Sequence, residues 1–191
     1  MLVVKLGGSL LRDPLLPAWL DRLATRGAGQ TVIVPGGGPF ADAARALQKE
    51  WRVDDVCAHN MAVLGMTQTA RLLHGIEPRL ALADSEAGLR ARLAEGRAVI
   101  WLPLALQRDA PDPLTSWDVS SDSLAAWLAL RLRACAVVLV KSCAVPAQAT
   151  PAALAAAGIV DRAFPGYAAQ CARAGIACDV VTRTDMAQVV G

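Results

Sequence analysis

The stretch VVKLGGSLL at residues 3–11 carries the strongest indication of the fold class. Its apolar run is interrupted at Lys5, and two adjacent glycines, Gly7 and Gly8, follow one residue later. A short, continuous apolar run is typical of a strand that is buried on both faces of a parallel sheet. The glycines predict a tight turn at the carboxyl end of this strand, where parallel α/β sheets bind their ligands.

Similar runs return along the chain, and longer helical patterns separate them. We expect strands at residues 2–6, 31–34, 98–102, 136–140 and 177–181. We expect helices at residues 15–26, 40–51, 55–73, 85–94, 121–133 and 151–157. This alternation predicts an α/β fold, a three-layer α/β/α sandwich around a mainly parallel sheet.

Length and composition exclude several classes of protein. The 191 residues are enough for a single domain, 54% of them are apolar, and the net charge is +2. Because the basic residues do not cluster, we expect no nucleic-acid partner. The apolar runs are far shorter than the roughly 20 residues that a membrane helix needs, and no cleavable leader is recognisable. We therefore expect a cytoplasmic protein without a membrane partner.

The cysteines argue against a disulfide framework and against a metal centre. Cys57, Cys135, Cys143, Cys171 and Cys178 form no CxxC pair and lie mostly in apolar stretches. An odd number of cysteines at wide spacing favours reduced, buried thiols over a zinc site. We expect no metal site built from the protein's own side chains.

Glycine or lysine also follows two further predicted strands. Gly36, Gly37 and Gly38 open a predicted helix, and Lys141 and Ser142 follow the strand at 136–140. Glycine turns at a helix start expose backbone N–H groups that suit phosphate, and a nearby lysine adds a mobile positive charge. Either glycine turn alone could be a simple tight turn. Both turns, together with two of the chain's three lysines, favour an anion-binding site.

Common nucleotide and hydrolase motifs are absent from the sequence. Neither turn has the GxxxxGK[ST] spacing of a P-loop or the GxGxxG spacing of a dinucleotide fold, and there is no GxSxG elbow. Asp118 and Asp122 lie four residues apart near the start of the predicted helix at 121–133. Asp122 either caps this helix or orients the two strand-end lysines, and phosphoryl transfer depends mainly on such positioning.

Three segments together resemble the amino acid kinase superfamily, which includes acetylglutamate, uridylate, aspartate and isopentenyl phosphate kinases. They are residues 3–11, VIVPGGGPFAD at 32–42 and WDVSSDSLAAWLA at 117–129, in the family's order. The resemblance implies ATP with Mg²⁺ as cofactors, and a homo-oligomer of two or more copies. It also implies one domain, with residues 1–133 mainly an acceptor-binding lobe and residues 134–191 a shortened nucleotide-binding lobe.

The resemblance also implies roles for single residues. Lys5 would contact the transferred phosphoryl group, Asp122 would organise the lysines, and Lys141 would replace a second phosphate-binding lysine that relatives carry further along the chain. The glycines would line the phosphoryl path and hold the acceptor: Gly7, Gly8, Gly36, Gly37 and Gly38. The residues expected to hold ATP are Lys5, Gly8, Ser9, Lys141 and Ser142.

Within the superfamily, the segments at 57–73 and 154–168 resemble most the small kinases of methanofuran biosynthesis. These kinases phosphorylate (5-(aminomethyl)furan-3-yl)methyl phosphate. His59 lies where isopentenyl phosphate kinases place a histidine on the acceptor phosphate, although simple packing would also explain it. Asp118, at a position where acetylglutamate kinases have a substrate-contacting asparagine, is the candidate partner of the acceptor's amine.

Two alternative functions stay open at this point. The first is a kinase for a carboxylate or a nucleoside monophosphate. The second is a non-catalytic anion- or nucleotide-binding protein on the same fold, which the short C-terminal region favours. Retention of Lys5, Asp122 and both glycine turns favours an enzyme.

Overall fold

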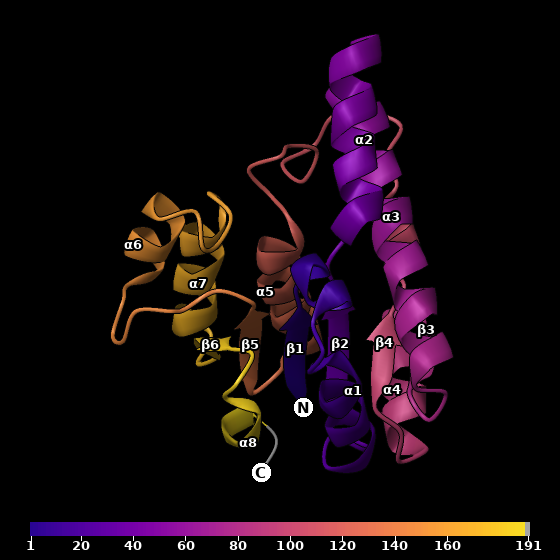
Figure 1. The fold of residues 1–191 in the computed structure, drawn as a ribbon, viewed down its shortest axis with the longest axis vertical. Coiled ribbons are helices and arrows are strands. Elements are labelled where there is room, and N and C mark those ends of the chain that lie inside the picture. Colours follow the sequence, from indigo (N-terminus) through magenta and orange to yellow (C-terminus); the bar gives the residue numbers. More distant parts are fainter. Residues whose placement is uncertain (190–191) are drawn as a thin grey trace.

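A single six-stranded parallel sheet forms the centre of the computed structural model, which describes residues 1–189 (Figure 1). Its strand order is β3-β4-β2-β1-β5-β6. The strands are β1 (Leu2–Leu6), β2 (Thr31–Pro35), β3 (Ala81–Ala83), β4 (Val99–Trp101), β5 (Ala136–Lys141) and β6 (Ala177–Thr182). The helices are η1 (Gly8–Arg12), α1 (Leu16–Thr25), α2 (Gly38–Trp51), α3 (Asp55–Ile76), α4 (Glu86–Ala94), η2 (Pro103–Leu106), α5 (Ser121–Leu132), α6 (Pro151–Ala156), α7 (Phe164–Arg173) and α8 (Met186–Val189).

Helices cover both faces of the sheet, as the alternation of strands and helices predicts. Val3 and Val32 point to one face, where they join a core with buried side chains of α4, α5 and α7. Val4 and Ile33 point to the opposite face and pack with α1 and the end of α3. Because neighbouring residues of each strand are buried on opposite faces, the strands have the continuous apolar runs of a parallel sheet. The three-layer α/β/α prediction is confirmed.

The expected strands are all present, but the sequence did not predict the strand β3, the helices α7 and α8, or the short helices η1 and η2. β3 was not predicted because its three residues, Ala81–Ala83, are short and two of them are alanine, a weak strand former. The helix α7 was missed because Pro165 and Gly166 suggest a break in the chain. Proline is tolerated in the first turn of a helix, where its missing N–H has no helical partner.

The predicted lobes share this one sheet. β1, in the segment at 1–133, pairs with β5, in the segment at 134–191, from Leu2↔Ala136 to Leu6↔Val140. The last two residues of the second segment lie outside the described residues. The boundary between an acceptor-binding and a nucleotide-binding lobe stays a prediction.

Two further features bear on the sequence predictions. Among the described helices, none combines the length and the apolar character that crossing a membrane requires. The expectation of buried thiols is wrong for Cys57, Cys135 and Cys143, which are exposed, whereas Cys171 is buried. The sequence around these three cysteines is mostly apolar, so local hydropathy did not predict that their side chains are exposed.

The helices α2 and α3 position the candidate site. They lie side by side and extend beyond the carboxyl edge of the sheet in Figure 1. α2 starts directly after β2, so the PGGGP turn lies at that edge. The helix α5 packs against β1 and β2, and the loop at residues 107–120 leads into its start.

Candidate active site

Two lysines and one aspartate form a buried charged cluster at the carboxyl edge of the sheet. Lys5 comes from β1, Lys141 from the end of β5, and Asp122 from the first turn of α5. The Lys5 Nζ lies 2.8 Å from Asp122 Oδ1. The Lys141 Nζ lies 2.7 Å from Oδ1 and 2.6 Å from Oδ2 of the same carboxylate. The structure thus brings together the three residues that the sequence selected as catalytic, with at most 8% of each exposed.

The charges in this cluster do not cancel. Burial alone would raise the pKa of Asp122, but the ammonium groups of Lys5 and Lys141 outweigh burial and lower it below its usual value. Burial and the neighbouring Lys5 charge lower the pKa of Lys141 to about 8, and the attraction of Asp122 offsets them only in part. Two protonated lysines against one carboxylate leave a net positive charge that an anion such as phosphate can neutralise.

The two glycine turns touch each other beside this cluster. A Cβ atom on Gly8 would lie 2.3 Å from Cα and N of Gly38, and a Cβ on Gly36 would lie 2.4 Å from the Gly8 nitrogen. Only residues without a side chain allow the two backbones to approach this closely. Gly37 is the N-cap of α2 and offers no side-chain cap. Pro39 has no N–H, so the backbone N–H groups of Gly38 and Phe40 are the ones that remain available to an anion at this helix start.

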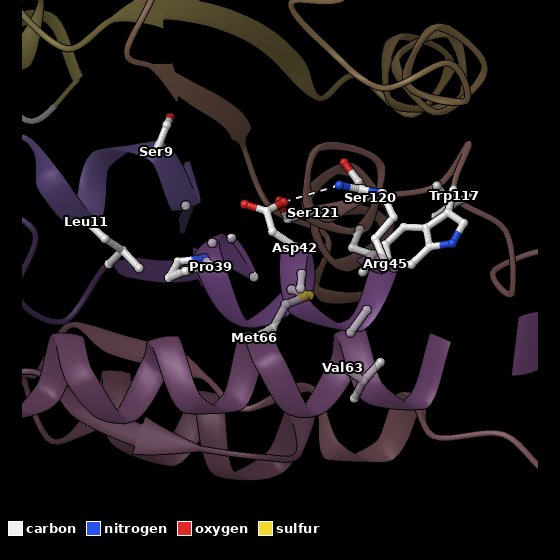
Figure 2. A pocket seen from close by; sticks show the side chains of 18 of the residues that line it. Ser9, Leu11, Pro39, Asp42, Arg45, Val63, Met66, Trp117, Ser120 and Ser121 are labelled. Atoms are coloured by element: carbon white, nitrogen blue, oxygen red, sulfur yellow. Dashed lines mark hydrogen bonds and ion pairs between the residues drawn. The ribbon is translucent and has the colours of Figure 1, made fainter. Parts of the chain in front are cut away.

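A pocket of about 620 Å³ opens next to the glycine turns (Figure 2). Ser9, Leu11 and Pro39 lie at one end, while Asp42, Arg45 and Trp117 lie towards the other. Met66 and Val63 line the α3 side with apolar surface. The pocket therefore joins a backbone-lined, phosphate-sized end to a wider apolar and aromatic end, which is the usual character of a small-molecule site.

The expected ATP contacts lie together at the ends of β1 and β5. Ser142 Oγ donates to Ser9 Oγ at 2.9 Å, which ties the loop after β5 to the first glycine turn. A Cβ on Gly7 would lie 3.5 Å from the Lys5 Nζ. Gly7 thus lies beside the charged cluster, and Ser9 and Ser142 contact each other next to it in the chain.

His59 lines the pocket, but one ring nitrogen is already engaged. Its Nε2 lies 2.7 Å from the carbonyl oxygen of Leu106 in η2. A carbonyl oxygen only accepts, so Nε2 carries the proton, and in the neutral ring Nδ1 is an acceptor. A hydrogen bond from His59 to an acceptor phosphate would therefore require the imidazolium form. Its substrate-binding role stays a prediction.

The structure does not bring Asp118 into the main pocket. Asp118 lines a neighbouring groove, and its Oδ1 lies 3.5 Å from Nη1 of Arg162. Trp117, one residue earlier, does line the main pocket, and its indole Nε1 donates to Gln48 of α2. The loop into α5 therefore turns the indole inward and the Asp118 carboxylate outward.

Asp161 is a structural partner of the cluster that the sequence analysis missed. Its carboxylate accepts hydrogen bonds from N and Oγ of Ser120 at 2.8 Å, from N and Oγ of Ser123, and from the Phe164 backbone nitrogen at 2.9 Å. Its own backbone N–H donates to Asp122 Oδ2 at 3.2 Å. Asp161 thus connects the starts of α5 and α7 beside the charged cluster.

An α/β protein with a positively charged cluster and an uncapped helix start at its strand ends belongs to a class suited to holding phosphate. The chain belongs to the amino acid kinase family, which it matches over residues 1–144. This match covers both glycine turns, Asp122 and Lys141.

Similar proteins agree with this family. The chain is 30% identical over 130 residues to the [5-(aminomethyl)furan-3-yl]methyl phosphate kinase of Methanocaldococcus jannaschii, a match over 67% of this chain and 59% of that relative. The fold is similar to the uridylate kinase of Archaeoglobus fulgidus, with a TM-score of 0.71 and 17% identity over 100% of this chain and 95% of that chain. It is also similar to an isopentenyl phosphate kinase, with a TM-score of 0.56 and 16% identity over 96% and 91% of the two chains.

Proposed function

We propose that this protein transfers the γ-phosphoryl group of ATP to a phosphorylated small molecule, with (5-(aminomethyl)furan-3-yl)methyl phosphate as the preferred acceptor. The observation that carries this proposal is the buried Lys5–Asp122–Lys141 cluster beside the two touching glycine turns. The acceptor is proposed because the similar protein of Methanocaldococcus jannaschii is a [5-(aminomethyl)furan-3-yl]methyl phosphate kinase.

The residues at the strand ends fit the phosphates of ATP. The net positive charge of the buried cluster, the uncapped start of α2 and the hydroxyls of Ser9 and Ser142 all suit phosphate oxygens. When bound, ATP would supply the γ-phosphoryl group and leave as ADP. Lys5 and Lys141 would neutralise the charge on the moving group, and Asp122, which contacts both ammonium groups, would hold them in place.

Mg²⁺ would arrive with the nucleotide in this proposal. The described residues include no cluster of three or more His, Cys, Asp or Glu side chains that could hold a metal ion. Mg²⁺ is often held by one or two carboxylates together with substrate phosphates, and it keeps several waters. An ionised phosphate acceptor needs no general base, so the cluster has only to position the transferred phosphoryl group and neutralise its charge.

The test of this function is ADP release with ATP, Mg²⁺ and the aminomethylfuran phosphate. Lys5→Ala is expected to lower turnover at least about 100-fold, the usual cost of removing one group that stabilises the transition state. Lys49→Ala removes an exposed lysine of α2 and serves as the matched control.

The other outcomes separate the alternatives. If the protein binds ATP but forms no ADP with the aminomethylfuran phosphate, UMP and a carboxylate are tested as acceptors. Turnover with either of them would show that the proposed acceptor is wrong. ATP binding without turnover on any acceptor would favour the non-catalytic binding protein.

The alkaline side of the pH profile is expected to report on Lys141. Since its pKa is lowered to about 8, kcat/KM for ATP should fall as pH rises above about 8, because the neutral amine no longer attracts phosphate. Lys141→Arg keeps its positive charge above that pH and should extend activity to higher pH. Steady-state rates between pH 6.5 and 10 would show this, with Lys49→Arg as the control. An unchanged alkaline limb in Lys141→Arg would contradict the assignment.

We also propose that the protein works as a homo-oligomer in the cytoplasm. Large apolar side chains stay exposed on the outer sides of α2 and α3: Leu47, Trp51, Leu64, Leu72 and Ile76. Exposed apolar groups on neighbouring helices are typical of a subunit interface. Light scattering of the purified protein would measure the number of copies.

A further inference from the structure

The charges inside the pocket are unevenly distributed. Among the described residues that line it, Arg12, Arg45 and His59 can carry positive charge, and Asp42 has the one carboxylate. Arg12 forms no ion pair within the described part of the chain and lies at the end of η1, which starts in the first glycine turn. The glycine end of the pocket therefore suits an anion, and Asp42 is placed to meet a cation.

Asp42 lies at a suitable distance from the glycine turns to meet the cationic group of a ligand whose phosphate is bound there. It follows Gly38 by four residues on α2, which is about one turn or roughly 6 Å along the helix axis. Its carboxylate is 74% exposed, and in Figure 2 it lies in the same part of the pocket as Ser121 and Arg45. A ligand with its phosphate at the glycine turns would extend along α2 towards this carboxylate.

The surroundings of Asp42 hold it in place and leave it room for a ligand. Arg45 Nη1 donates to Asp42 Oδ1 at 3.2 Å, while within the described chain Oδ2 has no partner. The Arg45 guanidinium is itself stacked over the Trp117 ring, 4.3 Å from its centroid. A side chain fixed in this way loses less entropy when a ligand binds.

The competing carboxylate is less well placed. Asp118 faces the neighbouring groove, where Arg162 pairs with it at 3.5 Å. Asp118 does not line the main pocket, although Arg45 and Trp117 line both the pocket and this groove. The sequence pattern pointed to Asp118 for the acceptor's amine, and the geometry of the folded chain favours a different residue.

We infer that Asp42 selects acceptors that carry a positively charged amine, by accepting a hydrogen bond from the ammonium group on its free Oδ2. This inference rests on the proposed function, because it concerns how the same pocket chooses its acceptor. At a carboxylate that is mostly exposed, a charge-assisted hydrogen bond of this kind is worth up to about fivefold in affinity.

The test compares two ligands and four proteins. The ligands are (5-(aminomethyl)furan-3-yl)methyl phosphate and (5-methylfuran-3-yl)methyl phosphate, which lacks the amine. Calorimetry would measure their binding to the wild type, Asp42→Asn, Asp118→Asn and Glu50→Gln, the last being an exposed residue of α2 away from the pocket. Thermal unfolding checks that each variant is folded.

The wild type is expected to bind the amine ligand roughly fivefold more tightly than the methyl ligand. Asp42→Asn should bind both with the affinity of the methyl ligand, while Glu50→Gln should keep the full preference. The inference is overturned if the wild type shows no preference, if Asp42→Asn keeps it, or if Asp118→Asn loses it instead. Failure of the proposed function would look different: wild type would form no ADP from this acceptor, whichever ligand it preferred.

Discussion

Replacing Asp122 with Asn is expected to lower the free energy of unfolding by about 3–5 kcal/mol, the usual cost of leaving a buried charge without its partner. Both Lys5 and Lys141 depend on this one carboxylate, at distances of 2.6 to 2.8 Å. Asparagine has nearly the same shape but no charge, so two buried ammonium groups would lose the one carboxylate that both contact, and only the more distant charge of Asp161 would remain. Turnover should fall as well, because the lysines would lose their common anchor.

Urea denaturation of the wild type and Asp122→Asn would measure this loss. Adding Lys141→Met to Asp122→Asn should recover part of the stability, because one of the two unpaired charges is removed. Asp118→Asn, a change of an exposed carboxylate near the same helix start, is expected to stay within about 0.5 kcal/mol of the wild type. A similar loss in both Asn variants would show that Asp122 acts as an ordinary helix-start residue.

The parts of the site that could be predicted are those that follow a strand end in the sequence. Lys5 and Lys141 come at or next to the ends of β1 and β5, which are neighbours in the sheet. Parallel strands bring their carboxyl ends to the same edge, so their positions along the chain were enough to predict that they meet. Asp122 was predictable because a helix start after a loop also lies at that edge.

The direction of side chains on loops could not be predicted in the same way. Trp117 and Asp118 are adjacent and both line the neighbouring groove, yet of the two only Trp117 also lines the main pocket. Which way each side chain points depends on partners distant in sequence, Gln48 for Trp117 and Arg162 for Asp118. No local spacing encodes these partners.

The pocket wall formed by α2 was missed for a related reason. Asp42 and Arg45, three residues apart, read as an ordinary ion pair on an exposed helix surface. Their role in the pocket depends on Trp117, which lies on a loop far along the chain and stacks with Arg45 in the folded protein. An exposed helical pair becomes part of a site only when tertiary structure places another element over it.

The other large expected effect concerns Asp161. Replacing it with Ala should lower the free energy of unfolding by about 2–4 kcal/mol, because donors at the starts of both α5 and α7 lose their acceptor. Its carboxylate also contributes a stabilising charge near Lys141, which raises the pKa of that lysine towards its ordinary value. The alkaline limb of kcat/KM should therefore move to lower pH in Asp161→Ala, and a purely structural role would not produce this shift.

Arg162→Ala is the matched control, because Arg162 is the next residue, its side chain is 83% exposed, and its loss should change stability by less than about 0.5 kcal/mol. Asp161→Asn keeps one oxygen and most of the shape but carries no charge, so its stability should lie between those of the wild type and Asp161→Ala. Both variants should shift the pH profile in the same direction, since both remove the charge. If Asp161→Asn matched the wild type in stability and in its pH profile, the carboxylate charge would have no part in holding α5, and Asp122 would keep its position through the lysines and the Asp161 backbone N–H.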